Sequence, residues 1–122
     1  MSMLKPLDPS FPIQNQLAIP ASPVVLVNVF TLDAADEPNF LAVWQDDAAF
    51  MKAQPGFIST QLHRAIGPNP TYLNYAVWET TDHFAAAFAH PDFHAKLANY
   101  PASAVASPHL FQTVAVPGIC VA

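Results

Sequence analysis

Tyr72-Leu73-Asn74-Tyr75-Ala76-Val77-Trp78-Glu79 is the stretch from which the fold is best inferred. It is aromatic and β-branched and follows a Gly-Pro-Asn-Pro turn, which predicts a strand. Side chains alternate across a strand, so Asn74 shares one face with Tyr72, Ala76 and Trp78. Both faces are largely apolar, which indicates an inner strand covered on both sides. Asn74 therefore needs a protein partner or a ligand, because an unpaired buried amide costs about 1–3 kcal/mol.

Composition limits the classes of function. The chain has 122 residues and 52% hydrophobic content, enough for one domain with its own core. Four Lys and Arg against nine Asp and Glu give a net charge of −5, which argues against binding to nucleic acid or anionic lipid. Cys120 is the single cysteine, so neither a disulfide framework nor a cysteine zinc site is expected. With no apparent signal peptide or membrane span, we expect a soluble, cytoplasmic protein.

Residues 1–23 are predicted to form a proline-rich arm, and residues 24–122 a single domain. Prolines at five positions of the arm argue against a helix or an inner strand there. Its apolar residues indicate that it packs either on its own domain or on a dimer partner. In the second case Phe11, Ile13, Leu17 and Ile19 would reach over the neighbouring copy.

The rest of the chain alternates strands and helices. Strands are predicted at 24–32, 57–65, 72–79 and 109–116. The first helix is predicted to follow Asp33 or Asp36 and to end at Pro55-Gly56; the second is capped by Thr81 and restarts at Pro91. This order predicts an α+β, ferredoxin-like split βαβ fold (βαββαβ), with an antiparallel sheet and two helices on one face. The other sheet face is also apolar, which favours a homodimer packed sheet against sheet.

Within the first helix, large apolar side chains recur at helical spacing and are expected to face inward: Phe40, Trp44, Ala48 and Met51. Asp46, Asp47 and Lys52 are assigned to the solvent side. Arg64, the only arginine, is expected either to orient an anion or to pair with Glu79.

Four motifs, in order and spacing, resemble the antibiotic biosynthesis monooxygenase family. They are Asn28-Val29-Phe30-Thr31, Gln54-Pro55-Gly56-Phe57, the stretch from Asn74 to Thr80, and the helix break at Pro91-Asp92-Phe93. The resemblance covers about Val24 to Val116 and implies a ferredoxin-like domain that dimerises into an α+β barrel.

The resemblance also implies a site. In cofactor-independent, quinone-forming members, an Asn and a Trp that match Asn74 and Trp78 line a cavity between sheet and helices. Those members use a Tyr on the following helix, where this chain has Phe84, so a phenolic proton relay is absent at that point. Asn28 resembles an Asn of the heme-degrading members. Their Trp and His positions fall near Ala87 and Leu97 here, which argues against heme.

We therefore predict a cofactor-independent monooxygenase that uses molecular oxygen on an electron-rich aromatic, phenol or quinol. No dinucleotide fingerprint or phosphate loop is visible. The histidines lack metal spacing on one element, since Pro91 separates His90 from His94. Asn74 would donate to the substrate oxygen, Trp78 would shape the cavity, and His109 at the pocket rim would move the proton. Residues predicted to bind the substrate are Asn28, Trp44, Phe84 and Phe88.

Two alternatives remain open. A non-catalytic, small-ligand-binding or stress-related dimeric barrel is favoured by Phe84 in place of the family Tyr. Asn28 and Asn74 are expected on neighbouring strands, so they could bond to each other instead of to a ligand.

Overall fold

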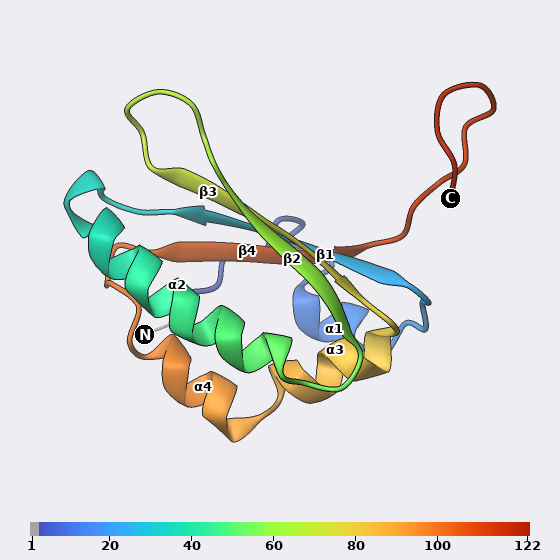
Figure 1. The fold of residues 1–122 in the computed structure, drawn as a ribbon, viewed down its shortest axis with the longest axis horizontal. Helices are drawn as coiled ribbons and strands as arrows, with labels where there is room; N and C mark the ends of the chain where they lie inside the picture. The colour runs from blue at the N-terminus through green and yellow to red at the C-terminus, as the bar shows by residue number, and fades with distance from the viewer. Residues whose placement is uncertain (1–2) are drawn as a thin grey trace.

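The structure is a computed structural model that describes residues 3–122. Its elements are α1 (Ile13–Gln16), β1 (Val24–Thr31), the short 3-10 helix η1 (Ala34–Asp36), α2 (Glu37–Lys52), β2 (Phe57–Arg64), β3 (Thr71–Trp78), α3 (Thr81–Phe88), α4 (Pro91–Leu97) and β4 (Val105–Phe111). The described strands form one antiparallel sheet in the order β2-β3-β1-β4. Helices α2, α3 and α4 lie along one face of the sheet (Figure 1). This arrangement confirms the predicted ferredoxin-like α+β fold.

The core lies between the sheet and the helices, in two clusters of buried side chains. Around Phe40, which is fully buried, the rings of Phe30 and Tyr72 lie 5.0 and 4.9 Å away, centroid to centroid. Trp78 and Phe84 anchor the second cluster, with ring centroids 5.7 Å apart. Edge and tilted aromatic contacts of this kind each add about 0.5–1.5 kcal/mol beyond burial.

Helix starts follow local sequence signals. Helix α2 has Pro38 in its first turn, where the missing N–H of proline costs no helical hydrogen bond. The cap of α3 is Thr80 rather than the predicted Thr81: the Thr80 backbone is extended, and its Oγ1 accepts a 3.1 Å hydrogen bond from the His83 amide. Thr81 is instead the first helical residue and is buried. Among residues 3–122, none of the helices has the length and apolar character that crossing a bilayer requires.

The arm packs on its own domain, which is the first of the two alternatives, and its central residue Ile13 is buried there. Lys5 N donates to Ala106 O at 2.8 Å and Ala106 N donates to Met3 O at 2.7 Å, which adds a short parallel bridge at the edge of β4. Ile13 and Gln16 are both 4% exposed. The expectation of no helix in the arm is wrong, because the proline-free stretch after Pro12 accommodates the single turn of α1.

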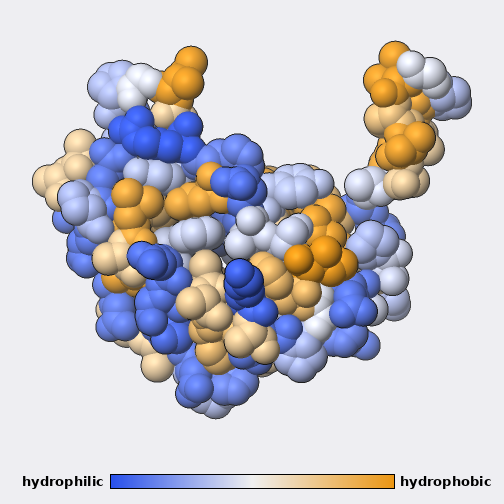
Figure 2. Space-filling view, in the orientation of Figure 1, coloured by the Kyte–Doolittle hydropathy of each residue, from blue (hydrophilic) through white to orange (hydrophobic). Residues whose placement is uncertain are grey.

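The last strand lies earlier than predicted, at Val105–Phe111 instead of 109–116. It pairs with β1 along its length, from Val105 opposite Thr31 to Phe111 opposite Val25. Residues 112–122 leave the body as a projecting tail with apolar side chains (Figures 1 and 2). Val114, Ile119 and Val121 in this tail are exposed.

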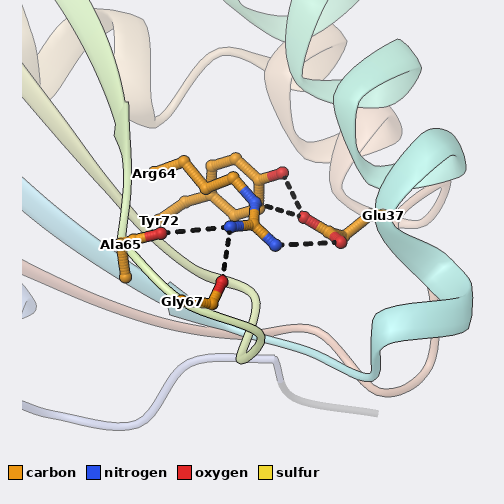
Figure 3. A network of polar contacts seen from close by, with 5 residues as sticks. All are labelled: Glu37, Arg64, Ala65, Gly67 and Tyr72. Atoms are coloured by element: carbon orange, nitrogen blue, oxygen red, sulfur yellow. Dashed lines mark hydrogen bonds and ion pairs between the residues drawn. The ribbon is translucent and has the colours of Figure 1, made fainter.

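Arg64 pairs with Glu37, not with Glu79 (Figure 3). Its Nε and Nη2 donate to the two oxygens of the Glu37 carboxylate at 2.7 and 3.2 Å. The Tyr72 hydroxyl donates to the same carboxylate at 2.7 Å. These hydrogen bonds lower the pKa of Glu37 and connect the start of α2 to strands β2 and β3.

Candidate functional site

A cavity lies between the sheet and helices α2, α3 and α4. The space between these elements, counted out to the open solvent at its mouth, is about 720 Å³. Its walls are mostly aromatic and aliphatic. Six of the residues predicted for the site line it together: Asn28, Trp44, Asn74, Trp78, Phe84 and Phe88.

The aromatic wall is rigidly packed. Trp78 and Phe84 are each 1% exposed, and the Trp78 ring also meets Phe57 edge-on at 5.4 Å. Phe88 continues the wall, 5.4 Å from Phe84. Phe84 places an apolar ring against Trp78, so this part of the cavity excludes water without supplying a hydroxyl.

Asn74 holds one polar atom toward protein and leaves another for a ligand. Its Oδ1 accepts a hydrogen bond from Thr60 Oγ1 on β2. Its Nδ2 makes no hydrogen bond to any residue that the structure describes. The Thr60 contact therefore orients the amide and leaves two N–H donors for an oxygen in the cavity.

Asn28 is the register partner of Asn74 across β1 and β3. The two amides share no hydrogen bond. Within residues 3–122, Asn28 Oδ1 is buried without a partner, an arrangement that costs free energy unless a donor from a ligand reaches it.

His109 is not brought to the cavity. In register it lies opposite Val27, whereas its neighbour Pro108 lies opposite Asn28 and lines the cavity. Alternation along β4 therefore directs His109 away from the face that carries Asn28. The ring Nδ1 lies 3.0 Å from Gln16 Nε2 of the arm. The predicted position of His109 at the pocket rim was wrong because the strand was predicted to start at His109. Its true start at Val105 puts His109 on the same face as Val105 and Ser107.

Asp47 is the site residue that the sequence prediction missed. It was assigned to the solvent side, but it lines the cavity. The Tyr100 hydroxyl donates to Asp47 Oδ2 at 2.8 Å, while Oδ1 is buried with no partner among the described residues. Burial raises the pKa of Asp47 to about 6, and the Tyr100 hydrogen bond and the charge of Lys96 oppose that rise.

A spacing signal for Asp47 exists in the sequence. Phe40, Trp44, Asp47 and Met51 follow each other at intervals of four, three and four, which is the repeat of one helix face. A carboxylate on the inward face of a helix is a candidate functional group. Asp47 was assigned to the solvent side because it is charged.

His90 and His94 lie away from the cavity lining. His90 Nδ1 accepts from the Asp92 amide at 3.0 Å and so caps α4, and His94 is exposed. Residues 3–122 contain no cluster of three His, Cys, Asp or Glu side chains suited to a metal ion.

Comparisons with known proteins agree with this architecture. The model of the antibiotic biosynthesis monooxygenase family matches residues 23–98. Deoxynogalonate monooxygenase from Streptomyces nogalater is 37% identical over 75 residues, which are 62% of this chain and 63% of that protein. The match thus spans somewhat less than two thirds of this relative's length.

Solved structures of other proteins have a similar fold. SnoaB, a cofactor-independent oxygenase from Streptomyces nogalater, is 32% identical with a TM-score of 0.69, over 80% of this chain and 99% of that one. Rv0793 from Mycobacterium tuberculosis shares the fold, with a TM-score of 0.66 at 11% identity, over 80% of this chain and all of that one.

Proposed function

The chain belongs to the antibiotic biosynthesis monooxygenase family, and on that premise we propose that it is a cofactor-independent monooxygenase. Its substrate would be an electron-rich aromatic, phenol or quinol, and its oxidant molecular oxygen. The observation that carries the proposal is the free amide of Asn74 in a cavity walled by Trp78 and Phe84. The cofactor-independent oxygenase SnoaB, with the same fold, supports it.

In this proposal the substrate supplies the electrons. A phenol loses its proton, and the resulting phenolate passes one electron to oxygen, giving a phenoxyl radical and superoxide. These combine at a ring carbon that bears hydrogen to form a peroxide anion. The anion takes back the phenol's proton to give a hydroperoxide, which loses water and leaves a quinone carbonyl. One oxygen atom enters the product and the other leaves as water.

The protein's part is electrostatic and steric. The Asn74 amide donates to the substrate oxygen and stabilises its negative charge, and such preorganised donors contribute most where water is excluded. Trp78 and Phe84 provide that dry wall. His109 has no role in this proposal, because it does not line the cavity.

Oxygen uptake with a panel of hydroquinones and dihydroxynaphthalenes tests the function. The wild-type protein should accelerate uptake over buffer with at least one of them. Asn74→Ala should lower kcat/KM by about 10²-fold, the usual effect of losing one oxyanion donor. Asn39→Ala, at an exposed position of α2, is the matched control and should keep full activity. Equal rates for the Asn74 variant and wild type would refute the role of Asn74.

A ligand-binding barrel without chemistry is the second candidate, favoured by Phe84 in place of the family Tyr. It predicts that the phenols bind, and quench the fluorescence of Trp44 and Trp78, without oxygen consumption by the wild-type protein.

We also propose a homodimer formed through the outer sheet face. Val27, Val29 and Val77 on that face are half-buried in one chain, and Tyr75 and Ile58 are 42% and 52% exposed. A two-fold partner that presents the same face would remove this apolar surface from water. Sedimentation at micromolar concentration should give a dimer, which Val27→Asp converts to monomer; a wild-type monomer would refute it.

The cytoplasmic location stays a prediction, testable by cell fractionation.

A further inference from the structure

We propose that Asp47 is the general base of this site, which takes the substrate's proton before oxygen reacts. The inference rests on the proposed function for its class of substrate, a phenol or its keto tautomer. Nothing in the family match assigns a role to Asp47.

Asp47 and Asn74 line the same cavity from opposite sides. Asp47 reaches the cavity from α2, on the helix face that also carries Trp44 and Met51. Asn74 lines the same cavity from β3. A substrate between helix and sheet therefore has a carboxylate on one side and an amide donor on the other. This pairing suits an acid whose oxygen becomes negative as its proton leaves.

The two oxygens of Asp47 are not equivalent. Oδ2 is held by the Tyr100 hydroxyl at 2.8 Å, and Tyr100 itself is 5% exposed in the core. Oδ1 is buried and has no hydrogen-bond partner among residues 3–122. One oxygen is thus fixed and the other keeps its lone pairs for a proton. A carboxylate with only a structural role would be expected to satisfy both.

The surrounding charges leave Asp47 without a salt bridge. Lys96 pairs with Asp46 at 2.7 Å, and Asp46 is mostly exposed. Of the described residues that line the cavity, Asp47 alone has an ionisable side chain. A group whose pKa is raised to about 6 is ionised at neutral pH, and it is a stronger base than an ordinary carboxylate.

In this proposal the proton moves from the substrate to Asp47 and then to the peroxide. An O–H bond of the phenol, or a C–H bond of its keto tautomer, breaks, and its proton forms an O–H bond at Asp47 Oδ1. The electron pair stays on the substrate as a delocalised anion whose oxygen binds the Asn74 amide. After that anion has reacted with oxygen, the Asp47 carboxylic acid returns the proton to the peroxide.

Deuterium exchange without oxygen tests the base separately from the oxidation. The probe is naphthoresorcinol, a dihydroxynaphthalene whose keto tautomer carries an acidic CH₂ group. Under nitrogen in D₂O, the wild-type protein should accelerate the loss of the C–H signal in the NMR spectrum over buffer. The rate should rise with pH through about 6, as Asp47 ionises. Asp47→Asn should lower the protein-dependent rate by about 10²-fold or more.

Two further variants exclude a merely structural effect. Glu79→Gln, at an exposed carboxylate outside the cavity lining, should keep the exchange rate. Tyr100→Phe removes a hydrogen bond that lowers the pKa of Asp47, so it should shift the pH midpoint upward. Melting temperatures establish that each variant is folded.

The outcomes separate the two proposals. Exchange that survives Asp47→Asn, or no exchange with the folded wild-type protein, overturns the role of Asp47. Exchange that depends on Asp47 without oxygen uptake with any phenol supports the base and overturns the monooxygenase. Oxygen uptake that is indifferent to Asp47→Asn leaves the monooxygenase in place without this base.

Discussion

Asn28 and Asn74 face each other across β1 and β3, yet each amide is in a different hydrogen-bonding state. Asn74 Oδ1 is bound by Thr60, whereas the buried Asn28 Oδ1 has no partner in the described part of the chain. Two chemically identical side chains at one register position therefore make opposite contributions to stability. Asn74 is supported by the protein, and Asn28 is left for what enters the cavity.

Replacing Asn28 by a side chain of the same shape should stabilise the protein. Asn28→Leu removes a buried acceptor whose missing bond costs about 1–3 kcal/mol, so the free energy of unfolding should rise by about 1 kcal/mol. Urea unfolding measures this change. Oxygen uptake should fall, because a ligand loses its acceptor on β1.

Asn74→Leu is the matched control for that substitution. It breaks the bond to Thr60 and leaves the half-buried Thr60 hydroxyl without its partner, so the free energy of unfolding should fall by about 1–2 kcal/mol. If both variants shift stability in the same direction, the assigned difference between the two amides is wrong.

The order of elements and the inward face of β3 followed from sequence because strong local signals agreed. Pro55-Gly56 follows closely after the end of α2 at Lys52, and the Gly67–Pro70 turn separates β2 from β3. The alternation from Tyr72 to Trp78 then set which side chains meet the helices. Where such agreement was missing, at Val105-Ala106-Ser107-Pro108, the strand was placed too late and His109 was put near the cavity.

The predictions for Asp47 and for the arm failed for a different reason. The helical spacing of Asp47 pointed inward, but its charge was given more weight, and the burial of both features depends on tertiary contacts. Nothing local indicates that Tyr100, 53 residues away, donates to Asp47. Likewise, nothing local indicates that Gln16 bonds to β4. The charge of Asp47 indicated an exposed side chain, and the prolines of the arm argued against a helix. In both cases contacts with distant elements decided the structure.

Asp47 should make stability depend on pH. Its pKa is raised on folding to about 6 from an ordinary value near 4, so its contribution is full below pH 4 and is lost as pH rises through 6. Asp47→Asn, which cannot ionise, should gain up to about 3 kcal/mol over wild type at pH 7.5. At pH 4 that gain should disappear. Thermal unfolding at both pH values measures it, and a gain independent of pH would contradict the raised pKa.

Gln16 should fix the arm to the domain. Its Nε2 donates to Phe11 O at 2.8 Å, and its Oε1 accepts from the Leu110 amide at 2.7 Å. Gln16→Ala leaves that amide without its partner and should lower the free energy of unfolding by about 2 kcal/mol. Gln14→Ala, two residues earlier and exposed, should have little effect. The affinity of the proposed homodimer should be unchanged by Gln16→Ala, because Gln16 bonds to its own chain.

Gly56 should be required for the position of α3. Its φ is +83°, and a Cβ there would lie 2.2 Å from His83 Cγ and 2.4 Å from His83 Cβ. Gly56→Ala therefore combines backbone strain of about 1–2 kcal/mol with a clash that pushes on the first turn of α3. Gly67→Ala is the control, since φ is +93° with nothing within 4 Å of the added atom, so it should show the strain alone.

Because α3 carries Phe84, a shift of its first turn should also widen the cavity beside Trp78. We expect Gly56→Ala to be less stable than Gly67→Ala by more than 1 kcal/mol in urea unfolding. In a Trp44→Phe background, Trp78 fluorescence should move to longer wavelength in the first variant only. The double variant Gly56→Ala/His83→Ala should recover only part of the loss, because alanine keeps the His83 Cβ. Complete recovery would show that the ring alone, and not the helix backbone, limits the approach of β2 to α3.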